Sequence, residues 1–257
     1  MLYIGIDLGT SAVKLLLMDA DGKIKKIAHP PYQSKISETS ESSIYPILIG
    51  IGCFSFFIKK EVFKMQILFF RHSMTAGNFE HRYLGCKTDE PLCPEGIAFA
   101  KQQAKQESFP LPEQVFVSPM RRCRETASIL FPNLKQQIHP DLRECDFGMF
   151  EGKNYRELSN CPEYQAWIDS GGTLPFPDGE SREQFLTRSC AAVSEIVQTC
   201  KSDRIAIVAH GGTMMAVFSA CEMHHKSYFD WKIPHCEPFL CEVFRKNPLQ
   251  LQWKERN

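Results

Sequence analysis

Residues 66–78 read QILFFRHSMTAGN, a run of apolar residues that ends in an adjacent arginine and histidine. A short apolar run rich in β-formers is typical of a buried strand. Arg71 and His72 therefore stand where the chain leaves a sheet, and a stretch of small and polar residues follows them. Such a pair, taken alone, is more often the end of a strand meeting solvent than a catalytic pair. The remaining sequence has to decide between these two interpretations.

From Met65 to the end, apolar runs alternate with helical patterns. After QILFF, further strands are expected at 114–118, 204–210, 239–244 and 249–253. Helices are expected at 95–106, 121–130, 181–201 and 214–221. This alternation predicts an α/β fold, a three-layer sandwich in which helices cover both faces of a mostly parallel central sheet. We assign residues 65–257 to this domain.

The first 35 residues carry a different pattern, in which apolar and polar residues alternate around two turn signals. This pattern predicts a β-hairpin appendage with a third strand beginning near Lys25. The segment IDLGTS, residues 6–11, resembles the first phosphate loop of xylulokinase-type sugar kinases. That resemblance would place Asp7 near a metal, and Thr10 and Ser11 near phosphates. It ends near residue 35, and the later segments of such a kinase are not recognisable, so we expect a truncated fragment without kinase activity.

Residues 36–64 are expected to form a linker that contains one apolar run, IYPILIGIGCFSFFI at 44–58. A membrane-spanning helix needs about 20 consecutive apolar residues. The run is shorter than that and contains Pro46, Gly50 and Gly52, which disfavour a helix. A buried or irregular connector is therefore favoured, and membrane contact through 44–58 is the open alternative.

The composition excludes several classes of protein. Lysine plus arginine and aspartate plus glutamate balance at 30 each in 257 residues, so we expect no nucleic-acid partner. The 11 cysteines are odd in number and form no C-x-x-C pair, which favours reduced thiols and a cytoplasmic protein. The first ten residues lack the basic start of a secretory signal. Nothing in the sequence predicts the oligomeric state.

Three of the expected strands end in polar residues at equivalent places. QILFF ends in Arg71 and His72, QVFV ends in Ser118, and IAIVA ends in His210 followed by Gly211. In a parallel sheet these ends lie along one edge, where ligands of α/β proteins bind. A helix that begins after Gly211 and Gly212 would offer free backbone N–H groups to a phosphate. Arg122 follows the second strand, in a cluster that could equally be a solvated helix face.

Four segments in this order resemble the motifs of the histidine phosphatase superfamily, which includes the phosphoglycerate mutases. They are FFRHSMT, SPMRRCRETA, LRECDFGMFEG and VAHGG, and the resemblance covers residues 65–253. The stretches RHSMTAGNFEHRYLGCKTDEPLCPEG and PFPDGES are closest to bacterial enzymes of the alpha-ribazole phosphatase type. The resemblance implies a phosphoglycerate mutase-like fold.

The resemblance also implies roles for individual residues. His72 would take the phosphoryl group as a phosphohistidine, and Glu144 would protonate the leaving alcohol and later activate water. The residues that would hold the phosphate oxygens are Arg71, Arg122 and His210. Asn78 and Gly211 would bind the substrate. No metal or cofactor is expected, because the arginines and histidines supply positive charge and the other cysteines and histidines match no zinc-ligand spacing.

These roles predict metal-independent hydrolysis of a phosphomonoester, with alpha-ribazole 5′-phosphate or a small sugar or metabolite phosphate as substrate. Mutase-type phosphoryl transfer and a non-catalytic phosphate-binding module are the alternatives. Residues 155–177 are expected to cap the leaving group. Ser73 departs from the family, which has glycine after the nucleophile; the serine could crowd the site or donate a hydrogen bond, so we expect altered or reduced activity.

Overall fold

The computed structural model describes residues 3–8, 13–18, 24–28, 65–106, 109–224 and 226–254, with side chains from Met65 onward. The chain divides into two compact units, Met1–Glu61 and Val62–Asn257. The kinase-like Thr10 and Ser11 and the apolar run 44–58 lie outside the described residues. The division into 1–35, 36–64 and 65–257 therefore stays a prediction.

The first unit contains a three-stranded antiparallel sheet in the order β1-β2-β3. Its strands are β1 (Tyr3–Leu8), β2 (Val13–Met18) and β3 (Ile24–Ala28). The expected hairpin and its third strand are thus present.

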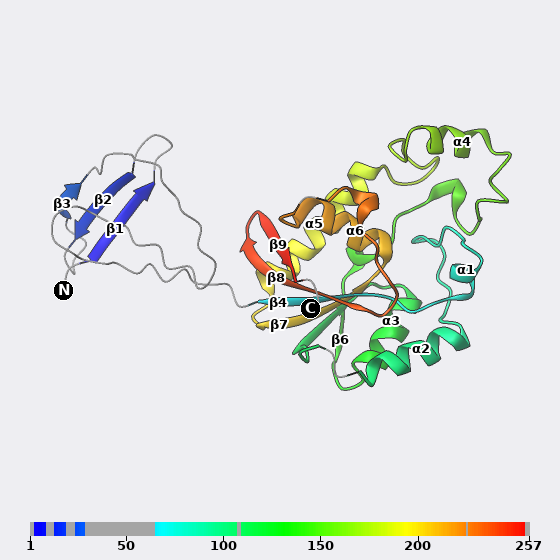
Figure 1. The fold of residues 1–257 in the computed structure, drawn as a ribbon, viewed down its shortest axis with the longest axis horizontal. Coiled ribbons are helices and arrows are strands. Elements are labelled where there is room, and N and C mark those ends of the chain that lie inside the picture. The colour runs from blue at the N-terminus through cyan, green and yellow to red at the C-terminus, as the bar shows by residue number, and fades with distance from the viewer. Residues whose placement is uncertain are drawn as a thin grey trace. The chain divides into compact units, whose positions relative to one another are not determined.

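The second unit is built on a six-stranded sheet in the order β6-β5-β7-β4-β8-β9 (Figure 1). Its strands are β4 (Gln66–Arg71), β5 (Gln114–Val117), β6 (Gln136–Ile138), β7 (Arg204–Ala209), β8 (Pro238–Lys246) and β9 (Leu249–Trp253). The first four strands of that order pair in parallel, whereas β8 pairs antiparallel with β4, and β9 pairs antiparallel with β8. The prediction of a mostly parallel sheet is confirmed.

Helices cover both faces of this sheet (Figure 1). The long ones are α2 (Pro94–Ala104), α3 (Arg121–Leu130), α5 (Arg182–Thr199) and α6 (Gly211–Cys221). The short ones are α1 (Ala76–Phe79), α4 (Pro162–Asp169) and the 3₁₀ turns η1 (Pro140–Leu142), η2 (Gly148–Phe150) and η3 (Tyr228–Asp230). Within the described part of the chain, no helix is long and apolar enough to cross a bilayer.

Alternate residues of the central strands form two separate cores, which is why the unit has three layers. On β4, Ile67 and Phe69 pack into the cluster that includes Val193 of α5 and Phe218 of α6. Leu68 and Phe70 of the same strand point the other way, into the cluster with Cys123 and Ala127 of α3. Successive side chains of a strand point to opposite faces, so an uninterrupted apolar run is what a sheet covered on both sides requires.

Candidate active site

The carboxyl ends of three adjacent strands bring the candidate residues together. In the register of the sheet, Arg71 at the end of β4 is opposite Ala209 of β7, and Val117 of β5 is opposite Val208. The residues that follow these strands therefore meet at one edge. The ring centroids of His72 and His210 are 5.2 Å apart, and Ser118 Oγ lies 2.7 Å from His210 Nε2. A pocket of about 320 Å³ opens at this edge.

Seven residues were predicted to form the site, and the structure places all of them at or directly behind this pocket. Five of them line it: Arg71, His72, Asn78, Glu144 and Gly211. The other two, Arg122 and His210, are fully buried behind the lining residues. Asn78 uses its Oδ1 to accept from the backbone N–H of Thr75, so its amide nitrogen is the group left to meet a ligand.

The imidazole of His72 is fixed as a neutral ring with one free nitrogen. Its Nδ1 lies 2.7 Å from the carbonyl oxygen of Ser73, and because a carbonyl only accepts, Nδ1 carries the proton. Burial lowers the pKa of His72 well below its ordinary value, and the charges of Arg122 and Arg71 lower it further. Nε2 therefore keeps a lone pair, as a nucleophile at phosphorus requires.

Two arginines flank this ring and are held by backbone carbonyls. Arg122, in the first turn of α3, is completely buried and donates to the carbonyls of Thr88, Leu84 and Gly85 at 2.6–3.1 Å. Arg71 donates from Nη1 to the carbonyl of Ile233 at 2.9 Å. The Nε of each is buried and has no hydrogen-bond partner in the part of the chain that the structure describes. Two such N–H groups beside a histidine suit an anion with several oxygens.

Arg122 does not belong to a solvated helix face, an alternative that the sequence had left open. The neighbouring Arg121 and Arg124 are exposed, whereas Arg122 is the largest fully buried side chain of the described residues. The turn of the helix thus places Arg121 and Arg124 at the surface and Arg122 in the interior.

Glu144 is a buried carboxyl group at the pocket wall, 7% exposed. Its Oε1 accepts from the N–H of Cys145 at 3.0 Å and its Oε2 from the N–H of Gly212 at 2.9 Å. Burial raises the pKa of Glu144, and the two backbone hydrogen bonds oppose this rise only in part. The group is thus suited to hold a proton at a higher pH than an ordinary glutamate.

Helix α6 begins at Gly211, before the expected start after the two glycines, so its first turn contains Gly212. The N–H of Gly212 is committed to Glu144, and a Cβ at Gly212 would lie 2.5 Å from Oε1 of that carboxyl group. The first turn of α6 therefore positions the acid, and Gly211 is the glycine whose backbone remains for a ligand.

Comparison with known proteins places this geometry in a family. The model of the histidine phosphatase superfamily, branch 1, matches residues 67–255, which is most of the chain. The chain belongs to the histidine phosphatase superfamily. It is an enzyme of the phosphatase type, as the names of its relatives also indicate.

Two curated relatives and one solved structure illustrate the similarity. The metal-independent phosphoserine phosphatase of Arabidopsis thaliana is 29% identical over 170 residues, covering 63% of this chain and 70% of the relative. The adenosylcobalamin/alpha-ribazole phosphatase of Salmonella typhimurium is 27% identical over 154 residues, covering 58% and 76%. The alpha-ribazole phosphatase of Shigella flexneri has the same fold, with a TM-score of 0.66, 22% identity and coverage of 75% and 96%. The sequence-based assignment to this family is confirmed.

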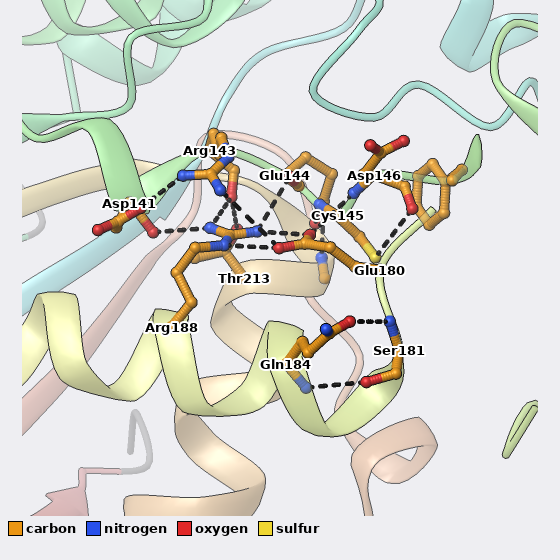
Figure 2. Close-up of polar contacts among 12 residues, drawn as sticks. Asp141, Arg143, Glu144, Cys145, Asp146, Glu180, Ser181, Gln184, Arg188 and Thr213 are labelled. Atoms are coloured by element: carbon orange, nitrogen blue, oxygen red, sulfur yellow. Dashed lines mark hydrogen bonds and ion pairs between the residues drawn. The ribbon is translucent and has the colours of Figure 1, made fainter. Parts of the chain in front are cut away.

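In this histidine phosphatase, the loop that carries Glu144 is held from below by Arg188 and Glu180 (Figure 2). Arg188 of α5 donates to the carbonyls of Asp141 and Arg143 at 2.9 and 3.2 Å, and to the carboxylate of Glu180 at 2.7 Å. Glu180 in turn accepts from the N–H of Asp146 at 2.9 Å. The pair thus fixes the backbone on both sides of Glu144.

Sequence reasoning missed this support, although Glu180 lies in the PFPDGES stretch that carried part of the family resemblance. It also missed the role of His235, which had been considered only among the histidines whose spacing matches no zinc site. The Nδ1 of His235 lies 2.6 Å from the carbonyl oxygen of His72, and the two ring centroids are 5.5 Å apart. Burial lowers the pKa of His235 to about 4, so the ring is neutral and donates from Nδ1. His235 therefore ties the end of β4 to the segment before β8.

Among the described residues, one group of three side chains could hold a metal ion: Cys86, Asp146 and Glu151. The Asp146 carboxylate pairs with Lys87 at 2.9 Å, and Glu151 accepts from the Thr88 hydroxyl at 2.7 Å. Both carboxylates thus already bind neighbouring side chains, and none of the three residues lines the pocket. The absence of a functional metal stays a prediction.

The hydroxyl of Ser73 points away from the pocket. It donates to the carbonyl of Gly96 in α2 at 2.7 Å, while the N–H of Ser73 donates to the Thr126 hydroxyl at 2.9 Å. Ser73 is fully buried and is not among the pocket-lining residues. From the sequence, Ser73 could either crowd the site or donate a hydrogen bond. The structure contains the hydrogen bond.

We expect Ser73→Gly to lower the free energy of unfolding by roughly 1–2 kcal/mol, because the hydrogen bond to Gly96 is lost and the unfolded chain gains freedom. Its kcat/KM should stay within about twofold of the parent, since a hydrogen bond outside the reacting geometry contributes little to transition-state binding. Chemical denaturation and steady-state kinetics measure the two effects. Ser73→Ala is the matched control, and a glycine variant much faster than the alanine variant would show that the Cβ crowds the site.

Proposed function

We propose that this histidine phosphatase hydrolyses small-molecule phosphomonoesters without a metal ion, through a phosphohistidine on His72. The observation that carries the proposal is the fixed tautomer of His72, whose Nδ1 is 2.7 Å from the Ser73 carbonyl while the ring lines the pocket. A neutral imidazole with Nε2 free is the form that attacks phosphorus.

In the first step, Nε2 of His72 forms a bond to phosphorus and the ester P–O bond breaks. The leaving alkoxide takes the proton of Glu144, which becomes a carboxylate. The free Nε–H groups of Arg71 and Arg122 match the negative charge on the three equatorial oxygens, and His210, whose pKa burial lowers, would add a neutral ring N–H as a donor. The carboxyl group of Glu144 can supply the proton because burial raises its pKa.

In the second step, water attacks phosphorus, Glu144 takes a proton from that water, and the P–N bond breaks. Inorganic phosphate leaves, Nε2 regains its lone pair, and Glu144 is again protonated. Asn78 and Gly211 contribute polar groups to the pocket and would orient the phosphate in both steps. Alpha-ribazole 5′-phosphate is one candidate substrate, supported by the name of the Salmonella relative; phosphoserine is another, supported by the Arabidopsis relative.

The test is release of inorganic phosphate from a panel of phosphomonoesters in the presence of EDTA. We expect turnover that EDTA does not change, because the positive charge at the site comes from Arg71 and Arg122. Turnover that EDTA abolishes and Mg²⁺ or Zn²⁺ restores would contradict the mechanism. With 3-phosphoglycerate, recovery of the isomeric phosphoglycerate instead of phosphate would favour the mutase alternative, and absence of any product would favour a binding module.

A further inference from the structure

Beyond the phosphate-binding residues, most residues that line the pocket are apolar or aromatic. Tyr83, Phe147 and Met215 are half-buried and keep part of their surface open, whereas Leu84, Trp231 and Ile233 are buried behind it. Several of them are fixed by aromatic packing, since Tyr83 and Phe147 have ring centroids 5.3 Å apart and Phe147 and Phe176 5.0 Å apart. Such a surface gains free energy by removing apolar atoms of a ligand from water.

The charged residues of the lining offer no free cation for a second anionic group. The cations of the lining are Arg71 and Arg82. Arg71 is assigned to the phosphate under the proposed function. Arg82 is the remaining cation, and its guanidinium decides whether a carboxylate on the leaving group would find a partner.

Arg82 is already neutralised by two glutamates. Its Nε donates to Glu80 at 2.5 Å, and its two terminal nitrogens bind Glu157 at 2.8 and 3.2 Å. Nη1 also donates to the carbonyl of Gly152 at 2.5 Å. Four of the five N–H groups of the guanidinium are thus occupied. Two carboxylates share this one cation, so its charge is already matched within the protein.

From these observations we propose that the substrate is the phosphate ester of an uncharged, apolar alcohol, and that Glu157 sets this preference by holding Arg82. The inference rests on the proposed function. A carboxylate on the leaving group would lose its water without gaining a cation, because Glu80 and Glu157 already bind Arg82. Glu157 acts through Arg82 and is a positioning residue.

Matched substrates test the preference with the parent enzyme. Glycerol 3-phosphate and 3-phosphoglycerate differ only by a hydroxymethyl group in place of a carboxylate, and benzyl phosphate offers an apolar ring with an ordinary alkoxide as leaving group. We expect kcat/KM for benzyl phosphate to exceed that for glycerol 3-phosphate by at least about tenfold, as burial of a ring allows. Glycerol 3-phosphate should in turn exceed 3-phosphoglycerate by at least about fivefold.

The variant Glu157→Gln tests the role of the glutamate. Removing its charge while keeping an acceptor should release the charge of Arg82 and raise kcat/KM for 3-phosphoglycerate by about three- to tenfold, mainly through a lower KM. The constants for glycerol 3-phosphate should change less than about twofold. Glu163→Gln is the matched control, because Glu163 is exposed and does not line the pocket. A purely structural role of Glu157 would change both substrates alike.

The outcomes separate this inference from the proposed function. Equal use of the three esters, or a preference for 3-phosphoglycerate, would overturn the inference and leave the phosphatase mechanism intact. An unchanged ratio of 3-phosphoglycerate to glycerol 3-phosphate in a folded Glu157→Gln protein would overturn the role of Glu157. Failure to hydrolyse any ester, benzyl phosphate included, would overturn the proposed function and with it the inference.

Discussion

Replacing His72 with alanine is expected to reduce kcat/KM for phosphomonoesters by at least about 10³-fold, because no other group can form the covalent intermediate. The parent enzyme, quenched during turnover of a ³²P-labelled ester, should carry label that survives alkali and is released by acid, as a P–N bond is. The His72→Ala protein should carry none. Phosphate release and labelling of the protein measure the two effects independently.

Two controls make this result specific. His81→Asn changes an exposed histidine with a φ of 55°, a conformation that asparagine tolerates, and should leave both activity and labelling unchanged. Circular dichroism and thermal unfolding establish that the His72→Ala protein is folded. Residual activity above about a tenth of the parent, or label retained on the alanine variant, would contradict the assignment of His72 as nucleophile.

The sequence predicted the bounds of one strand and one helix beside the site almost to the residue. The strand expected at 204–210 is β7 (Arg204–Ala209), and the helix expected at 121–130 is α3 with the same bounds. The helix expected at 214–221 begins three residues earlier, at Gly211. Glycine has a poor helix propensity, so the two glycines at 211 and 212 did not indicate a helix. The hydrogen bond from the Gly212 N–H to Glu144 stabilises this first turn.

Weakly apolar elements were not predicted. Strand β6 has the sequence QQI and lies at the sheet edge with Gln137 and Ile138 exposed, so it carries no alternation of apolar and polar residues. Helix α4 lies within the segment 155–177 expected to cap the leaving group, and it has no fully buried residue. Its Tyr164 and Trp167 pack near Tyr83, with ring centroids 6.1 and 6.3 Å away. A capping role for 155–177 remains a prediction.

The residues of the candidate site could be predicted from the order of the strand ends and from the family resemblance. The pairing of charges around the site could not be predicted. The sequence shows three arginines close together near residue 122 without showing that Arg122 alone is buried. It shows Arg82 between two histidine-phosphatase motifs without showing that Glu80 and Glu157 neutralise it. Contacts such as that between Arg82 and Glu157 join residues 75 positions apart, and only the folded chain specifies them.

Replacing Glu144 with glutamine should reduce turnover of alkyl phosphates by about 10²- to 10⁴-fold, the usual contribution of a positioned acid. The effect on p-nitrophenyl phosphate should differ, because its leaving group needs no proton. For that ester the variant should release a burst of p-nitrophenol equal to the enzyme concentration, followed by slow turnover, since Glu144 is also the base that activates water. Stopped-flow absorbance measures the burst.

The pH profile completes this test. Burial raises the pKa of Glu144, so the protonated acid persists to higher pH than in an ordinary glutamate and its loss forms the alkaline limb of kcat/KM. With benzyl phosphate, whose leaving alkoxide needs the proton, that limb should be absent in Glu144→Gln, whereas the variant Glu95→Gln, which changes an exposed glutamate in the first turn of α2, should keep it. Burial lowers the pKa of His72 well below its ordinary value, so protonation of His72 should not limit the rate near neutrality. A glutamine variant that keeps the full rate on benzyl phosphate, or the same alkaline limb, would assign the proton to another group.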